Sequence, residues 1–148
     1  MCGFIGSVSV KPIDISLIDE ANKFIECRGP DAKCFIERKY DSYHLNFCFN
    51  RLSIIDLSAE ANQPMYSKDF STMVMFNGEI YNHTELRKDL QNQGLKFYTS
   101  HSDTETLLVG LSYYGIKFID KLRGQFAIAF FDERKSELSL IRDRLGQK

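Results

Sequence analysis

The chain opens with Met1-Cys2-Gly3-Phe4-Ile5-Gly6-Ser7-Val8-Ser9-Val10, in which residues 4–10 predict a β-strand with Cys2 at its end. Cysteine is small enough for cytosolic processing to remove the methionine before it, so that one residue then carries a thiol and a free α-amino group. Such an amine is able to take the thiol's proton without a histidine beside it. An α-amino group titrates at about pH 8 and a cysteine thiol at about pH 8.5, so a modest shift is enough to give a thiolate at neutral pH. By itself, a cysteine at position 2 is usually a tolerated small residue.

The composition is that of one globular domain without a strong charge. The 148 residues are enough for one core and too few for two. A formal net charge of -1, with both signs interspersed, argues against nucleic acid or an anionic membrane surface as a partner. We therefore expect small molecules or proteins as partners. Because the sequence contains no signal-like segment and no apolar run of membrane length, we expect a cytoplasmic protein.

The four cysteines are Cys2, Cys27, Cys34 and Cys48. They form no CxxC pair, and no histidines stand at the spacing of metal ligands, so that neither a zinc site nor a redox dithiol is indicated. In a reducing compartment the last three cysteines are expected to be small core residues.

Apolar segments of alternating and helical period predict a mixed fold. Further strands are predicted over residues 34–36, 44–49, 73–76, 126–131 and 138–141. A helix is predicted over 17–25 with Asp14 or Ser16 as its cap, because apolar residues recur there at the spacing of one helix face: Leu17, Ile18, Ala21, Phe24 and Ile25. The strand over 73–76 is expected to end at Asn77-Gly78, a pair typical of tight turns. The last two strands predict a hairpin. Strands at both ends with helices between them predict an α+β domain of stacked sheets and helices.

Two further helices carry clear local signals. Asn82 with Glu85, and Ser102 with Glu105, stand at the spacing of a capping box. Gly94 is a natural end for the first of these helices. The sequence therefore predicts two capped helices between the strand over 73–76 and the final hairpin.

Hydrolysis of an amide through a cysteine also needs donors for an oxyanion and groups that fix the substrate. Asn77 and Gly78 offer an amide side chain and an unobstructed backbone N–H as such donors. Arg51, at the end of a predicted strand, offers two parallel hydrogen bonds to a carboxylate. Glu79 and Asp103 offer negative charge to an ammonium group. The structural alternatives are an ordinary turn for Asn77-Gly78 and a favourable place at a helix N-terminus for Asp103.

The histidines allow a rival site, in which Cys2 pairs with His44, His83 or His101 as in Cys–His hydrolases. Nothing in the spacing selects one of the three. His83 stands at a predicted helix start and His101 beside a predicted cap, which favours surface or capping roles for both. No Walker-type or GxGxxG segment occurs, so an ATP site within these residues is not expected.

Eight short segments stand in a fixed order along nearly the whole chain. They are Met1-Cys2-Gly3, Arg28-Gly29-Pro30-Asp31, Arg51-Leu52-Ser53-Ile54-Ile55-Asp56, Gln63-Pro64-Met65, Phe76-Asn77-Gly78-Glu79-Ile80-Tyr81-Asn82, Ser102-Asp103-Thr104-Glu105, Leu122-Arg123-Gly124 and Arg142-Asp143-Arg144-Leu145-Gly146. Each is weak alone. Together they resemble the glutaminase domain of class II glutamine amidotransferases, the N-terminal nucleophile hydrolase type, and most closely the asparagine synthetase (glutamine-hydrolysing) family.

The resemblance implies a four-layer αββα sandwich of two antiparallel sheets. It also implies hydrolysis of L-glutamine to glutamate and ammonia through a γ-glutamyl thioester, with no metal or organic cofactor in this step. The residues it implies are Cys2, Asn77 and Gly78 for catalysis, and Arg51, Leu52, Ile54, Asn77, Gly78, Glu79 and Asp103 for substrate binding. In that scheme the α-amine of Cys2 is the base and Arg51 holds the substrate carboxylate. Asn77 and Gly78 form the oxyanion hole, and Glu79 and Asp103 bind the α-amino group.

The sequence departs from the family pattern in two places. Phe49-Asn50 stand before Arg51, where many members have histidine followed by a polar residue. After Gly146 the family continues with further strands and a synthetase domain, whereas this sequence ends at Gln147-Lys148. We therefore expect residues 1–148 to be a glutaminase domain without its last strands, with ATP and Mg²⁺ needed only in the synthetase domain. That domain is the expected partner, on another chain or in a parent protein.

Three alternatives stay open from the sequence. The chain could be the glutaminase domain of a phosphoribosyl-pyrophosphate amidotransferase or of a glucosamine-phosphate synthase, although residues 77–82 favour the asparagine synthetase branch. It could also be a non-catalytic regulatory or interaction module that keeps the fold. The acceptor of the ammonia and the oligomeric state are not determined by the sequence.

Overall fold

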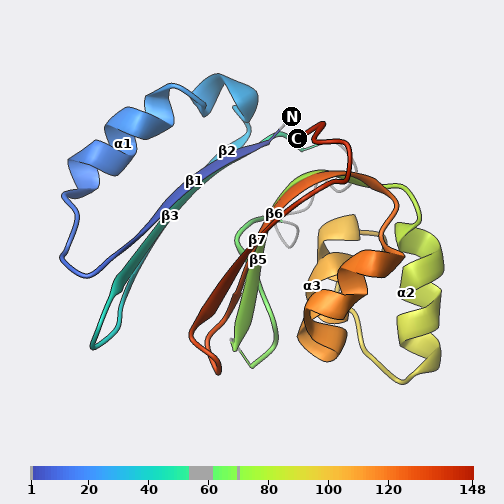
Figure 1. The fold of residues 1–148 in the computed structure, drawn as a ribbon. Helices are drawn as coiled ribbons and strands as arrows, with labels where there is room; N and C mark the ends of the chain where they lie inside the picture. Colours follow the sequence, from blue (N-terminus) through green and yellow to red (C-terminus); the bar gives the residue numbers. More distant parts are fainter. Residues whose placement is uncertain (1, 54–61, 70) are drawn as a thin grey trace. The chain divides into compact units, whose positions relative to one another are not determined.

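A computed structural model describes residues 2–53, 62–69 and 71–148 of the chain (Figure 1). The chain divides into two compact units, Met1–Ser53 and Ile54–Lys148. Each unit combines one antiparallel sheet with helices on one face. This arrangement confirms the predicted α+β class. Among the described residues, every helix is too short or too polar to cross a membrane.

The first unit is a three-stranded sheet covered by one helix. Its strands β1 (Gly3–Ser9), β2 (Ala32–Lys39) and β3 (His44–Arg51) lie in the order β1-β3-β2, so that β3 is central and buried along its length. Helix α1 (Ile15–Lys23) and the short helix η1 (Glu26–Arg28) connect β1 to β2. In Figure 1, α1 runs along one face of this sheet.

Polar contacts at both ends of α1 explain how the helix is placed. The Asp14 side chain accepts a hydrogen bond from the Ser16 N–H at 2.9 Å, which confirms Asp14 as the cap. Near the other end, the Asn22 amide bonds to the Asn50 amide of β3. Because this contact sets the buried face, Leu17 and Phe24 are exposed, although their spacing had placed them on the apolar face.

The second unit is a four-stranded sheet with two helices on one face (Figure 1). The elements are β4 (Met65–Tyr66), β5 (Thr72–Ile80), α2 (His83–Asn92), α3 (Asp103–Tyr114), η3 (Gly115–Lys121), β6 (Gly124–Asp132) and β7 (Glu137–Arg142), with the strand order β4-β5-β6-β7. Alternate residues of β5 and β6 pack against the helices to form the core, which includes Val74, Phe76, Ile80, Leu86, Leu90, Leu107, Leu111, Phe126, Ile128 and Phe130.

Two local predictions in this unit are wrong. The strand expected to end at Asn77-Gly78 continues to Ile80, because β6 supplies paired residues as far as Gly124. Asn82 precedes α2 but makes no side-chain cap. Its amide instead bridges to the segment before β6, donating to the Lys121 carbonyl at 3.0 Å and accepting from the Arg123 N–H at 2.9 Å.

Other local predictions are confirmed. The Ser102 hydroxyl caps α3 by accepting from the Glu105 N–H at 3.2 Å, Gly94 follows the end of α2 with a φ of 85°, and β6 pairs with β7 as a hairpin. Among the cysteines expected in a core, Cys48 is buried and Cys34 partly buried. The expectation is wrong for Cys27, which is exposed because it lies on the surface turn η1.

Candidate active site

In the first unit, the Cys2 thiol lies against the backbone that follows β3. The Sγ atom accepts a hydrogen bond from the Leu52 N–H at 3.3 Å and lies 3.5 Å from the Leu52 carbonyl oxygen. Gly3 pairs with Asn50 in the β1–β3 register, and one further step along that register puts Cys2 opposite Arg51. The sheet therefore brings the candidate site residues Cys2, Arg51 and Leu52 together at the end of β1 where the chain begins.

The turn Arg28-Gly29-Pro30-Asp31 makes hydrogen bonds both to Cys2 and to the backbone that follows β3. Arg28 Nε donates to the Cys2 carbonyl at 3.3 Å. The Asp31 N–H donates to the Arg51 carbonyl at 3.0 Å, and the Asp31 carboxylate accepts from the Ser53 N–H at 2.7 Å. A Cβ on Gly29 would come within 2.3 Å of the Asn50 carbonyl, so only glycine allows this approach. The turn thus fixes the backbone around Arg51 from both directions.

Asn50 and Arg51 point to opposite faces of the first sheet, because side chains alternate along a strand. Asn50 and Asn22 of α1 are both 0% exposed, and their amides exchange two hydrogen bonds at 2.6 and 3.4 Å. Asn50, the polar residue before Arg51, is therefore satisfied by an amide pair on the helix side, and the departure from the family pattern is confined to Phe49. Arg51 is buried and belongs to the other face of the sheet, together with Phe49 and Phe47.

In the second unit, three backbone N–H groups from alternate residues of β5 lie along the strand edge beyond β4. The Phe76 N–H donates to Gln63 Oε1 at 2.6 Å, and the Ile80 N–H donates to the Asp103 carboxylate at 3.4 Å. The alternation of an antiparallel strand directs the Gly78 N–H to the same edge, between these two. Strand β4 pairs with β5 only at Val74 and Met73, so within the described residues no strand covers the edge at Gly78.

Gly78 has a backbone that other residues rarely adopt. Its φ is 154°, and a Cβ at this position would lie 2.0 Å from the Gln125 carbonyl oxygen of β6. The neighbouring Asn77 belongs to the face of β5 opposite the helices, since the core takes Phe76 and Ile80. Among the described residues, Asn77 Oδ1 is a buried atom without a hydrogen-bond partner. An amide in this state is available for a ligand.

Asp103 lies at the first position of α3 and is buried. Its carboxylate accepts from the Thr104 N–H at 2.8 Å as well as from the Ile80 N–H. Burial raises the pKa of Asp103, while the hydrogen bond from the Ile80 N–H and the charge of His83 act in the opposite direction. Asp103 thus lies next to the end of β5, where Glu79 is exposed. The second unit brings Asn77, Gly78, Glu79 and Asp103 to one end of β5.

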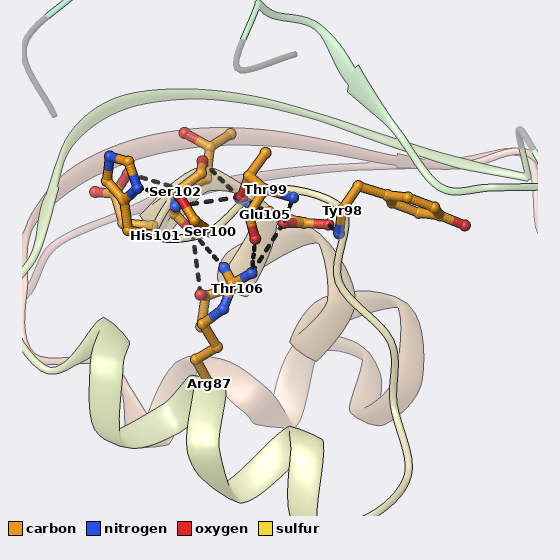
Figure 2. Close-up of polar contacts among 10 residues, drawn as sticks. Arg87, Tyr98, Thr99, Ser100, His101, Ser102, Glu105 and Thr106 are labelled. Carbon is orange, nitrogen blue, oxygen red and sulfur yellow. Dashed lines mark hydrogen bonds and ion pairs between the residues drawn. The ribbon is translucent and has the colours of Figure 1, made fainter. Parts of the chain in front are cut away.

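The segment before Asp103 is fastened by a buried ionic cluster (Figure 2). The Glu105 carboxylate accepts from the Tyr98 N–H at 2.5 Å, the Thr99 N–H at 2.9 Å and the Thr99 hydroxyl at 2.5 Å. Arg87 of α2 contacts Glu105 at 3.4 Å, donates to the Thr99 and Ser102 carbonyls, and stacks over Phe97. This cluster holds residues 98–102 onto both helices and thereby sets where α3 begins.

Comparison with known proteins agrees with this arrangement. The family model described as a glutamine amidotransferase domain matches residues 1–148. The chain belongs to the glutamine amidotransferase family.

Relatives of this glutamine amidotransferase domain match most or all of its length. It is 38% identical to asparagine synthetase [glutamine-hydrolyzing] 1 of Bacillus subtilis over 100% of the chain and 23% of the relative. It is 35% identical to asparagine synthetase [glutamine-hydrolyzing] 2 of the same organism, again over 100% of the chain and 19% of the relative. An amidase of Gibberella zeae, chry2, is 38% identical over 82% of the chain and 17% of the relative. The chain thus spans about a quarter or less of these relatives.

A solved structure shows the same fold. Glutamine phosphoribosylpyrophosphate amidotransferase of B. subtilis matches 90% of the chain and 35% of its own chain, with a TM-score of 0.66 and 19% sequence identity. At this identity the likeness concerns the fold alone. It confirms that the glutamine amidotransferase domain has the N-terminal nucleophile hydrolase fold that the sequence predicted.

The three histidines of the glutamine amidotransferase domain belong to different segments of the chain. His44 pairs with Ser9 at the opposite end of the first sheet from Cys2, about 20 Å away at the rise of a β-strand, so it is too far to be the base. His83 is the first residue of α2 and acts on Asp103 through its charge. His101 contacts the Ser100 hydroxyl beside the cap of α3.

Of the predicted site residues, Ile54 lies outside the described residues. The sequence had given no role to Gln63, which the structure places at the edge of β5. In the sequence, Gln63 was distinguished only by belonging to Gln63-Pro64-Met65, one of the eight segments that carry the family resemblance. No set of three or more His, Cys, Asp or Glu side chains in the described part of the chain is grouped as a metal site would require.

Proposed function

We propose that the chain hydrolyses L-glutamine to glutamate and ammonia, with Cys2 as the nucleophile. The observation that carries this proposal is the position of the Cys2 thiol against the Leu52 backbone, directly beyond Arg51. Membership in the glutamine amidotransferase family supports glutamine as the substrate, and so do the two Bacillus subtilis relatives, which are named as glutamine-hydrolysing asparagine synthetases. The buried Arg51 guanidinium is suited to the α-carboxylate of an amino acid.

The proposed reaction uses the free α-amine of Cys2 as the base. The amine takes the thiol proton, and the thiolate attacks the γ-amide carbon of glutamine, forming a C–S bond and a tetrahedral oxyanion. The Asn77 amide and the Gly78 N–H stabilise this oxyanion. The C–N bond then breaks as ammonia leaves with the proton. Water hydrolyses the resulting γ-glutamyl thioester, which releases glutamate and restores the thiol.

Substrate contacts follow from the charges of glutamine. Arg51 holds the α-carboxylate, the Leu52 and Ile54 segment lines the pocket, and Glu79 and Asp103 bind the α-ammonium group. The step requires no metal or organic cofactor. We further propose a cytoplasmic synthetase partner, on the same or another chain, that uses ATP and Mg²⁺ and accepts the ammonia. The relatives' names favour aspartate amidation to asparagine as that second reaction.

The test is turnover of glutamine by the purified chain. We expect its mass to show that Met1 is removed, and its product to be glutamate. Cys2→Ala should abolish turnover, because the thiol forms the covalent bond. Cys27→Ala is the matched control, since Cys27 is exposed, and should leave the rate unchanged. An uncleavable tag on the N-terminus should abolish turnover by removing the free amine.

Each other outcome has a definite meaning. Full activity with Met1 retained, or with the tag, would overturn the amine as base. Glutamine binding by calorimetry without turnover would show a binding module instead of an enzyme. Turnover by Cys2→Ala would overturn the nucleophile.

A further inference from the structure

We propose that Gln63 is a positioning residue that sets the Asn77–Gly78 edge of β5 relative to Asp103. This inference rests on the proposed function, because it assigns to Gln63 a part in stabilising the oxyanion. Gln63 is 7% exposed, and both polar atoms of its side chain are engaged. One end of its amide contacts the residue before Asn77, and the other contacts the residue after Asp103.

The first contact takes the place of a backbone hydrogen bond that β4 is too short to make to β5. Met65 pairs with Val74 and Tyr66 with Met73, so that the same antiparallel register continued by two residues puts Gln63 opposite Phe76. The strand β4 begins at Met65, so no backbone ladder extends to Gln63. The Gln63 side-chain oxygen accepts the Phe76 N–H at 2.6 Å in place of a backbone carbonyl. A side chain thus completes the sheet immediately before Asn77.

The second contact reaches the helix. Gln63 Nε2 donates to the Thr104 hydroxyl of α3 at 3.4 Å, and Thr104 follows Asp103. The Asp103 carboxylate in turn accepts the Ile80 N–H, two residues after Gly78. Gln63 and Asp103 therefore anchor the two sides of Gly78 on the same edge. Because a misplacement of about 1 Å costs roughly 100-fold in rate, this double anchoring matters for the donors between them.

The test compares variants that lose one contact each. Gln63→Met keeps the length of the side chain but accepts no hydrogen bond from Phe76, and should lower kcat by about 10- to 100-fold with KM within about threefold. Gln63→Glu keeps an acceptor for Phe76 and should recover most of kcat. Thr104→Val removes only the helix contact and should give a smaller fall in kcat. Gln91→Met on the exposed side of α2 is the matched control and should change nothing.

A second measurement separates oxyanion stabilisation from ordinary binding. L-Glutamate γ-semialdehyde forms a tetrahedral thiohemiacetal with a cysteine, whereas L-glutamate does not. In Gln63→Met, the affinity for the semialdehyde should fall by about the same factor as kcat, and the affinity for glutamate should be unchanged. A purely structural role would weaken both ligands alike.

The outcomes distinguish this inference from the function on which it rests. If the unaltered chain does not turn over glutamine, the proposed function fails and the role of Gln63 fails with it. If the unaltered chain is active and folded Gln63→Met keeps its kcat, only the role of Gln63 is overturned. If Gln63→Met does not fold, Thr104→Val decides, and an unchanged kcat in that variant overturns the inference.

Discussion

Asp103 is one of the carboxylates that we propose to bind the α-ammonium group of glutamine. It is buried at the start of α3 and accepts two backbone N–H groups, from Ile80 and Thr104. Burial raises its pKa, because the charged form loses contact with water. An ammonium group arriving beside it replaces the lost hydration, so the substrate itself would favour the ionised carboxylate.

We predict that Asp103→Asn raises the KM for glutamine by about 10- to 100-fold, the value of a hydrogen bond to a charged group. The effect should depend on pH in the unaltered chain. Since the pKa of Asp103 is raised above its ordinary 3.8, the carboxyl is neutralised at a higher pH than a free one, and KM should begin to rise there on acidification. Steady-state kinetics against pH measure both effects.

The matched control for this substitution is Asp89→Asn, on the exposed side of α2. It should leave KM and its pH profile unchanged. An Asp103→Asn variant with the KM of the unaltered chain would contradict a role for this carboxylate in binding.

At the scale of elements, α3 is positioned by side chains more than by its own helical tendency. The Ser102 cap satisfies one N–H of the first turn, as the capping-box spacing predicted. Glu105 does not turn back to Ser102 as a capping box would have it. Its carboxylate instead accepts hydrogen bonds from the Tyr98 and Thr99 N–H groups and forms an ion pair with Arg87 (Figure 2). The acidic residue was foreseen from sequence, and its partners from α2 and the loop were not, because they are brought near only by helix packing.

We predict that Glu105→Ala lowers the free energy of unfolding by about 3–5 kcal/mol, because it leaves the buried Arg87 charge uncompensated. Urea denaturation measures this loss. The comparison pair is Lys33–Asp19, a 2.6 Å contact between exposed side chains, where Asp19→Ala should cost at most about 1 kcal/mol. Equal losses at the two sites would show that the Glu105 cluster is no stronger than a surface ion pair.

At the scale of the whole molecule, several carboxylates tie the chain together and make it sensitive to acid. Asp143 accepts N–H groups from Phe126 of β6 and from Leu145, Gln147 and Lys148, and these bonds lower its pKa to about 2. Hydrogen bonds from Ser67 and Ser71 likewise lower the pKa of Asp69 to about 2. The ion pair with Arg134 lowers the pKa of Asp132.

We predict that the melting temperature falls as the pH is lowered from about 4 to about 2. A folded pKa below the unfolded value of about 3.9 stabilises the fold above that pH, and the contribution is lost as pH falls through the folded pKa. Asp143→Asn should flatten this fall, and Asp41→Asn, at an exposed position, should not. A melting temperature that is constant over this range would contradict the prediction.

Much of the fold was accessible from local pattern. The strands, the hairpin of β6 and β7, the Asp14 and Ser102 caps and the end of α2 at Gly94 follow from period and capping chemistry, which act between near neighbours. The exposure of Leu17 and Phe24 did not follow, because the buried face of α1 is set by the Asn22–Asn50 pair. The turn expected at Asn77-Gly78 was wrong for a similar reason, since β6 extends the pairing of β5.

The sequence by itself determined the candidate nucleophile, the other candidate site residues and the family, because these depend on residue identity and order. Only the tertiary structure decided that the thiol lies on the Leu52 backbone, that His44 is at the far end of its sheet, and that Gln63 completes the edge of β5. These are contacts between residues distant in the chain. They arise from strand register and helix packing, which no local pattern specifies.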